Sequence, residues 1–208
     1  MAKQASGTKV DPFKKFGSHA EDMRIALNQI DPSLAYKVGN MQWLNEMKEG
    51  IRYGNGETIS PLTEKMFLVA AMAELVTTTE PSARLATNMS AARDPKPDGE
   101  TEAHHIVAFK AKAARLSRLI LFGWKIAIND RDNGVHLPAF KRSVVASLPD
   151  ARKHRPIHTS VYHMAVFQRL QAQVKTKGLD TQAGREALRV IKEKILNGTF
   201  PYLREHLR

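Results

Sequence analysis

Two histidines stand side by side in a short apolar run, Ala103-His104-His105-Ile106-Val107. Neighbouring side chains of a β-strand point to opposite faces of that strand. One imidazole can therefore bind a metal ion while the other stays free to accept a proton, because imidazole is suited to both tasks near neutral pH. The pair predicts a site at which a metal ion and a general base act next to each other.

Two further histidines, His154 and His158, are four residues apart. On a helix this spacing places both imidazoles on one face, where they can complete the same metal site. His163 is the competing ligand, but it lies about 140° around an ideal helix from His158. It can share a metal with His158 only if the helix begins after His158. We therefore expect His154 as the ligand and keep His163 as the alternative.

The order of these motifs is specific: a His-His pair, then an Asn-Gly turn, then a histidine followed by threonine and tyrosine. In this order the sequence resembles the AHH nucleases of the HNH/endonuclease VII superfamily, which are mostly bacterial toxin domains. The resemblance covers residues 101–175, about a third of the chain. It rests on the segments Glu102–Val107, Phe122–Trp124, Asn129–Pro138 and His158–His163.

The resemblance implies a role for each side chain of the pair and of the turn. His104 is expected to bind the metal, and His105 is expected to act as the general base. The family also implies that Asn133, in the Asn-Gly turn, orients the base or, in some branches, binds the metal, and its amide oxygen can accept a hydrogen bond from His105. Asn-Gly is in addition a common turn pair, so Asn133 can serve the turn at the same time.

With His104, His154 and His158 as ligands, the site has three protein ligands and open positions for substrate and water. The expected cofactor is one divalent metal ion, namely Mg, Mn, Zn or Ni; nitrogen ligands suit the last three, whereas Mg prefers oxygen. Tyr162 is expected to pack against a ligand histidine or to form a hydrogen bond with it.

The positive charge of the chain is concentrated in the half that carries the histidines. Residues 1–100 hold 12 Lys and Arg and 13 Asp and Glu, a net charge of −1, whereas residues 101–208 hold 20 and 8, a net charge of +12. Such a basic excess favours a polyphosphate substrate. We expect phosphate contacts from Arg152, Lys153 and Arg155, although a basic, solvated surface would give the same pattern.

The run Asp94–Gly99, with its prolines, aspartates and glycine, predicts a linker. It divides the chain into residues 1–98, a helical N-terminal region for delivery or packing, and residues 99–208, the nuclease domain. The fold class is α+β and mostly helical, with the ββα-metal core of an HNH-like nuclease embedded in helices. Strands are predicted over 105–109, 126–128 and 135–137, and helices over 111–122, from after His158 to a stop at Gly178, and over 181–196.

The chain has no cysteine, which excludes disulfides and zinc thiolate sites. Its first residues lack the apolar segment of a signal peptide, and the longest apolar run, 66–73, is too short to span a bilayer. We therefore expect the protein to be made in the cytoplasm without a signal peptide and to have no membrane partner. If it leaves the cell, we expect a route other than general secretion.

Together these features predict a metal-dependent endonuclease that hydrolyses phosphodiester bonds of DNA. The family resemblance implies an antibacterial effector toxin, delivered into competitor cells, for example by type VI secretion, and active in the target-cell cytoplasm. The expected partners are DNA, with RNA as the alternative substrate, and an acidic immunity protein that matches the basic half. A secretion-system component or chaperone is expected to bind residues 1–98.

Three other functions stay open. The first is an RNase toxin. The second is a non-catalytic, basic nucleic-acid-binding domain with a structural zinc, whose closed site would need four ligands and could recruit both His154 and His163. The third is a housekeeping homing or recombination endonuclease, which is less favoured because residues 1–98 are near neutral and carry no recognisable motif for reading a DNA sequence.

Overall fold

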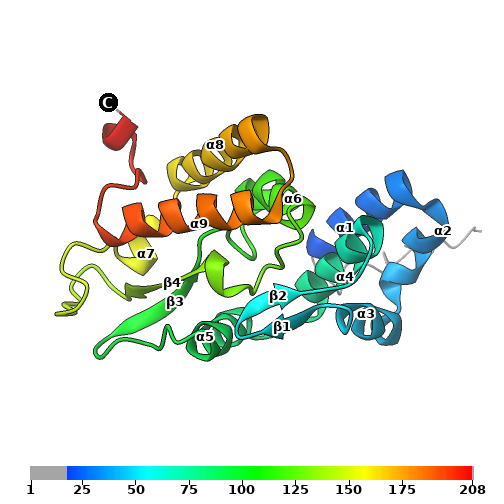
Figure 1. The fold of residues 1–208 in the computed structure, drawn as a ribbon, viewed down its shortest axis with the longest axis horizontal. Helices are drawn as coiled ribbons and strands as arrows, with labels where there is room; N and C mark the ends of the chain where they lie inside the picture. The colour runs from blue at the N-terminus through cyan, green and yellow to red at the C-terminus, as the bar shows by residue number, and fades with distance from the viewer. Residues whose placement is uncertain (1–17, 208) are drawn as a thin grey trace, which may run out of the picture.

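The structure, a computed structural model, describes residues 18–207, so residues 1–17 of the predicted N-terminal region and residue 208 lie outside it. Within this range, helices pack against two small antiparallel sheets of two strands each (Figure 1). The strands are β1 (Arg52–Gly54), β2 (Glu57–Ile59), β3 (Thr101–His105) and β4 (Gly134–Pro138). The α-helices are α1 (Ser18–Ile30), α2 (Pro32–Ala35), α3 (Met41–Lys48), α4 (Glu64–Thr77), α5 (Pro81–Ala91), α6 (Arg115–Gly123), α7 (His154–Ile157), α8 (Ser160–Lys177) and α9 (Thr181–Leu196). Short 3-10 turns cover Tyr36–Gly39, Lys112–Ala114, Arg131–Asn133 and Arg204–Leu207.

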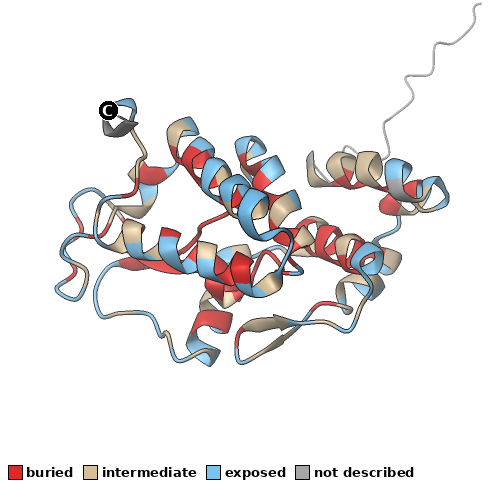
Figure 2. Cartoon of the chain, turned by 45° about the horizontal axis from the view of Figure 1, so that its top comes forward, coloured by how far each residue is buried: buried red, intermediate tan, exposed pale blue. Residues whose placement is uncertain are grey.

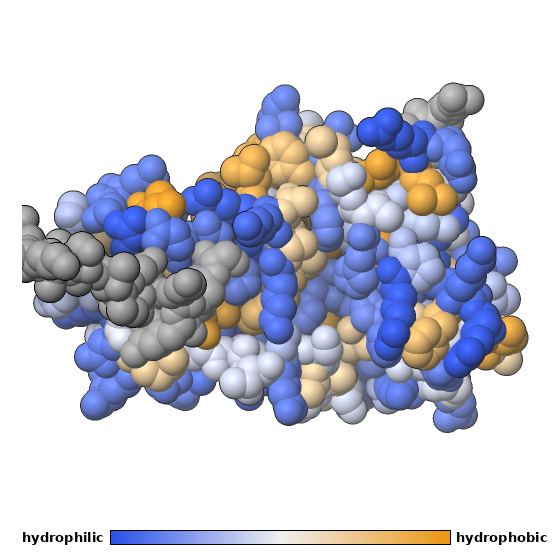
Figure 3. Space-filling model, turned by 180° about the vertical axis from the view of Figure 1, so that it is seen from behind, coloured by the Kyte–Doolittle hydropathy of each residue, from blue (hydrophilic) through white to orange (hydrophobic). Residues whose placement is uncertain are grey.

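The fold class is α+β and mostly helical, as predicted. Hydrophilic side chains cover most of the face shown in Figure 3, broken by apolar patches, as on the surface of an ordinary globular domain. None of the helices between residues 18 and 207 combines the length and the apolar character needed to cross a membrane.

The two-stranded sheet β3–β4 carries the paired histidines. The two strands run antiparallel, with His104 opposite Val135 and His105 opposite Gly134. Helix α5 packs against this hairpin from one side and α9 from the other (Figure 1). Gly134 has no room for a side chain, because a Cβ there would lie 2.6 Å from the Met89 sulfur of α5. The close approach of α5 therefore holds the strand that pairs with His105.

Two of the predicted strands were wrong. The chain forms β3 over residues 101–105 rather than 105–109, and residues 126–128 are buried without strand pairing. The reason lies just after His105. Ile106 N–H still donates to the carbonyl of Asn133, the next residue in register, but Val107 N–H donates to the Asn133 side chain, and the chain leaves the sheet there. The apolar run beyond that point indicated burial correctly, but a buried loop satisfies it as well as a strand does.

The C-terminal helices follow the predictions closely. Helix α8 begins after Thr159, whose hydroxyl accepts a hydrogen bond from the Tyr162 N–H. It ends at Gly178, which has a φ of 68°, a conformation that glycine adopts without strain. Helix α9 occupies the predicted range, and Asp180 caps its first turn. The helix predicted over 111–122 forms as a 3-10 turn followed by α6.

Both sides of the predicted linker contribute to one apolar core. Figure 2 shows buried residues running from the C-terminal helices through the sheet β3–β4 to the N-terminal helices. One continuous apolar cluster includes Phe67 of α4, Val135 of β4 and Leu188 of α9. Hydrogen bonds also cross the linker: Thr58 N–H donates to Asp130, and the Asn88 side chain donates to the Asn129 carbonyl. The N-terminal helices are thus packed directly against the segments that support the histidines.

Candidate metal centre and active site

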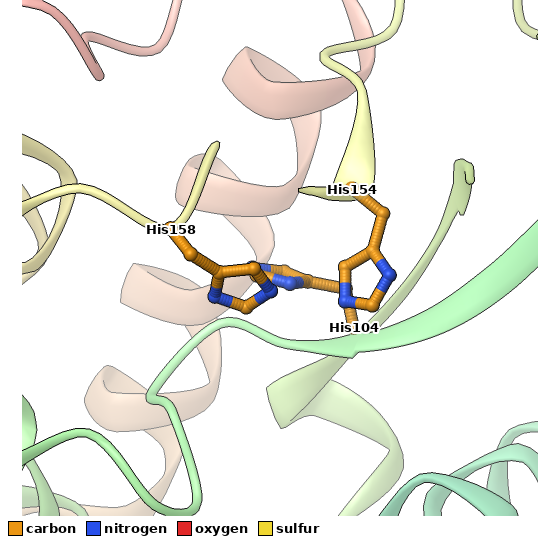
Figure 4. Close-up of side chains that lie close together, drawn as sticks. All are labelled: His104, His154 and His158. Carbon is orange, nitrogen blue, oxygen red and sulfur yellow. The ribbon is translucent and has the colours of Figure 1, made fainter. Parts of the chain in front are cut away.

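Three histidines from two elements converge on one point (Figure 4). His104 comes from β3, His154 begins the single turn α7, and His158 caps the end of that turn. One ring nitrogen of each lies within 4.8 Å of the others, and the ring centroids are 4.9–5.1 Å apart. These are the three residues that the sequence predicted as ligands, and the structure brings them together; the His154–His158 pair spans the single turn α7, before α8 begins.

Tyr162 fixes which nitrogen of His104 is available. The Tyr162 hydroxyl donates its one proton to the Ile106 carbonyl, 3.0 Å away. It can therefore only accept a hydrogen bond from His104 Nε2, which lies 2.9 Å from it. His104 Nε2 therefore carries the proton and Nδ1 carries the lone pair. His104 Nδ1 is buried and has no hydrogen-bond partner among the described residues. A buried nitrogen with a free lone pair beside two other imidazoles is the donor that a metal ion requires.

Glu102 fixes the orientation of His154 in a similar way. The carboxylate accepts a hydrogen bond from His154 Nδ1, so Nε2 is the nitrogen that a metal ion can bind. Carboxylate-histidine pairs of this kind hold metal-binding imidazoles in one tautomer and one ring orientation. Glu102 and His104 are two residues apart on β3 and therefore share a strand face.

The arrangement fits one divalent metal ion with three nitrogen ligands. His104 is almost fully buried, His154 is half-buried and His158 is exposed, so the group opens toward solvent on the His158 side. Burial and the neighbouring imidazoles lower the pKa of His104 well below 6.5, and they lower the pKa of His158 to about 4. Both imidazoles are consequently neutral at pH 7, which is the form that binds metal.

His163 lies outside this group of three. It is buried on α8 and packs edge to face against Tyr162, with ring centroids 5.4 Å apart. Because α8 begins after His158, the geometric condition for His163 to share its metal is met, yet the structure brings His154 to the site instead. Among the described residues the group therefore has three histidine ligands and no fourth His, Asp or Glu.

His105 belongs to a different environment from His104. Its Nε2 lies 3.0 Å from the amide oxygen of Asn129, and burial lowers its pKa to about 4. His105, His154 and His158 line one cavity of about 550 Å³, which Lys110 and the start of α5 also border. A neutral imidazole thus shares a cavity with two of the three metal-binding candidates.

The expected contact between Asn133 and His105 was wrong. The Asn133 amide oxygen accepts from Val107 N–H at 2.7 Å, and its amide nitrogen donates to the Val107 and Ile128 carbonyls. Asn133 therefore satisfies the backbone where the chain turns away from β3, and Asn129 takes the place beside His105. Both asparagines lie in the same loop, but only a three-dimensional structure shows which one reaches the imidazole.

The three predicted phosphate-binding residues differ in their surroundings. The Arg152 side chain donates to the Phe200 carbonyl and that of Lys153 to the Ser143 carbonyl, so both are tied to the protein backbone. Arg155 has 63% of its side chain exposed and stacks over the Phe140 ring at 4.1 Å. Of the three, Arg155 is the side chain that stands in solvent next to the histidines.

Three residues of this site were not predicted from the sequence: Glu102, Asn129 and Glu74, which contacts Asn129. Glu102 had a signal, because the two-residue period of a strand places it on the face of His104. Glu74 also had one, as a lone carboxylate within the apolar run of α4. Asn129 had none, since it lies 24 residues from His105 and no local pattern links the two.

Comparison with known protein families gives one match. The model of the AHH family, described as a nuclease family of the HNH/ENDO VII superfamily with conserved AHH, matches residues 85–195, more than half of the chain. The matched range contains all three metal-binding candidates, His105 and Asn129, and it leaves out Glu74. Searches of curated proteins and of solved structures gave no match.

Proposed function

Since the chain belongs to the AHH family, a nuclease family of the HNH/ENDO VII superfamily, we propose that it is a divalent-metal-dependent endonuclease that cleaves DNA. The observation that carries this proposal is the cavity that His105 shares with His154 and His158, next to the buried lone pair of His104. A general base beside a three-histidine metal site is a sufficient set of groups for hydrolysing a phosphodiester.

The side chains of this site have separable tasks in that reaction. A divalent ion held by His104, His154 and His158 would supply Lewis-acid stabilisation of the charge on the phosphodiester oxygens. His105, whose Nε2 proton is directed at Asn129, keeps a lone pair on Nδ1 to accept a proton from the attacking water. Tyr162 and Glu102 hold two of the ligand imidazoles in the required tautomers.

DNA as the substrate is supported by charge rather than by a base-reading motif. The half of the chain that contains the site has a net charge of +12, which raises both the encounter rate and the affinity for a polyphosphate. Lys110 lines the cavity, and the exposed Arg155 follows His154 in sequence and lies 3.9 Å from Glu102, so these two cations are the candidates for contacts with backbone phosphates. Contacts of this kind do not depend on sequence, so we expect cleavage with little sequence preference.

The biological role that we propose is an antibacterial effector toxin. The support for it is the resemblance to a family whose members are mostly bacterial toxins. The protein would be delivered by a secretion system, for example type VI, that recognises residues 1–98, and it would act in the cytoplasm of the target cell. The producing cell would then need an immunity protein, which we expect to be acidic because the surface it must cover is basic.

One experiment tests the proposed activity. The purified full-length chain is incubated with plasmid DNA and with a structured RNA, each in the presence of EDTA or of Mg²⁺, Mn²⁺, Zn²⁺ or Ni²⁺. We expect DNA cleavage with at least one metal and none with EDTA. Cleavage of RNA alone would replace the substrate with RNA, and cleavage in EDTA would rule out the metal-dependent mechanism. Binding without cleavage under every condition would favour a structural zinc site.

A further inference from the structure

Glu74 is a buried carboxylate in helix α4, whose other buried residues are all apolar. Seven other residues of α4 between Phe67 and Leu75 are buried, and all are Ala, Val, Leu, Met or Phe. Glu74 is 3% exposed, and it lies eleven residues before the segment that matches the nuclease family. Burying a carboxylate costs several kcal/mol unless hydrogen bonds compensate for the lost water, so its partners are informative.

Those partners connect Glu74 to the candidate general base. The Asn129 amide nitrogen donates to Glu74 Oε1 at 3.0 Å, and the Asn129 amide oxygen lies 3.0 Å from His105 Nε2. On the other side, the Tyr53 hydroxyl contacts both carboxylate oxygens at 2.7 and 2.9 Å. A continuous row of hydrogen bonds, Tyr53–Glu74–Asn129–His105, thus runs from hairpin β1–β2 through α4 to β3.

The direction of every hydrogen bond in this row follows from Glu74. A carboxylate can only accept, so the Asn129 side chain must turn its NH₂ group toward Glu74. Its oxygen must then face His105, and an amide oxygen also only accepts. His105 must therefore carry its proton on Nε2, which leaves the lone pair on Nδ1.

We propose that Glu74 is a positioning residue that sets the tautomer of His105 through Asn129. The helix α4, outside the matched nuclease segment, is in this sense part of the active site. The inference rests on the proposed function in one respect: it takes His105 as the general base. The hydrogen-bond directions themselves do not depend on that assignment.

The neighbouring residues favour an ionised Glu74 despite its burial. Burial raises the pKa of this carboxyl above its ordinary value, and the hydrogen bonds from Asn129 and Tyr53 and the nearby cations Arg84 and Lys48 limit that rise. The Arg84 guanidinium lies over the Tyr53 ring at 5.6 Å from its centroid. The carboxylate is thus held between two donors, with positive charge close by.

The test compares the full-length, zinc-loaded wild type with Glu74→Gln, using protein labelled with ¹⁵N at histidine. The glutamine keeps the size of the side chain but can present either an oxygen or an NH₂ group to Asn129, so the amide is free to reverse. ¹⁵N NMR of His105 distinguishes an Nε2–H from an Nδ1–H tautomer. We expect Nε2–H alone in the wild type and a mixture in Glu74→Gln. We also expect kcat for DNA cleavage to fall about tenfold or more with KM nearly unchanged.

Phe67→Leu is the matched control. Phe67 is fully buried on the same helix and takes no part in the hydrogen-bond row. This variant should lose stability but keep the wild-type His105 tautomer and kcat. A loss of kcat in Phe67→Leu equal to that in Glu74→Gln would show that both act through folding, and it would overturn the positioning role.

Two results separate this inference from the proposed function. If His105→Ala retains full nuclease activity, His105 is not the base, and the proposed function fails whatever the tautomer. If His105→Ala is inactive but Glu74→Gln has wild-type kcat and tautomer, the positioning role alone fails. An Nδ1–H tautomer in the wild type would overturn the role even if Glu74→Gln does not fold.

Discussion

The two faces of strand β3 are supported in different ways. His104 faces a cluster built from β3, α7 and α8, where its partners His154, His158 and Tyr162 all lie within nine residues of one another in sequence. His105 faces a row of hydrogen-bonded side chains: Asn129 from the loop before β4 and Glu74 from α4, both buried, and the half-buried Tyr53 from β1. The metal face is therefore a local structure that opens to solvent, whereas the base face depends on the packing of the whole chain.

Because of this difference, we expect substitutions near the two faces to have different effects. A metal ion can draw three imidazoles together, because coordination supplies free energy of its own. A general base has no such external partner and must be oriented by the protein. Changes to Glu74 and to the side chains that hydrogen-bond with it should therefore affect the rate through His105 while leaving metal binding intact. Changes around α7 should do the reverse.

The largest effect is expected from removing the base. His105→Ala should lower kcat by roughly 10²–10⁴, the usual contribution of a general base, because none of the other described histidines shares its contact with Asn129. The measurement is plasmid cleavage at saturating metal. A fall of less than threefold, with the protein folded, would contradict the assignment of the base face.

The next largest effect concerns the metal face. His154→Ala should weaken metal binding at least tenfold, and Glu102→Gln should weaken it by about tenfold through the loss of the carboxylate that orients His154. His163→Ala is the control, because His163 is close to the site but outside the group of three. Titration calorimetry with Zn²⁺ measures all three. If His163→Ala binds metal poorly and His154→Ala binds it normally, His163 and not His154 is the metal ligand.

The two asparagines of the loop give a sharper comparison. Asn129→Ala should lower kcat about tenfold, since it frees His105 from its acceptor. Asn133→Ala removes the partner of Val107 N–H and of two carbonyls, so it should lower the free energy of unfolding by about 2 kcal/mol or more. Urea denaturation and steady-state kinetics on both variants separate the effects. Equal losses of kcat and of stability in the two variants would contradict the separate roles of Asn129 beside His105 and Asn133 at the backbone.

The smallest effect is a dependence of stability on pH in the metal-free protein. The pKa of His105 is about 4 in the folded chain because of burial, whereas an unfolded histidine titrates near 6.5. Protonation thus favours the unfolded chain, so stability is complete above about pH 6.5 and falls as the pH drops toward 4. Melting temperatures in EDTA between pH 7.5 and 4 should show this decline, and His105→Ala should show less of it. An identical decline in both proteins would mean that His105 is not buried as described.

The sequence predicted which three histidines come together, because they lie in short motifs with readable spacing. His104, His154 and His158 meet as expected, and the helices that follow them are capped by Thr159, Asp180 and Gly178, whose preferences are local. The fold class followed from the same features.

The base face could not be predicted in the same way. Asn129 lies 24 residues from His105 in sequence, and Glu74 lies 55 residues from Asn129. No sequence periodicity indicates contacts between residues so far apart. The strand limits also failed, since a buried loop and a strand give the same apolar run. Asn133, chosen for its turn motif, proved to hold the backbone because its position after a 3-10 turn brings it against Val107.

The central claim is that the two adjacent histidines divide the work, His104 binding the metal and His105 acting as the base. Metal content of purified full-length His104→Ala and His105→Ala, measured by elemental analysis after dialysis against Zn²⁺, tests this most directly. We predict close to one zinc ion per chain in the wild type and in His105→Ala, and a clear deficit in His104→Ala. A metal-free His105→Ala beside a fully loaded His104→Ala would contradict the account.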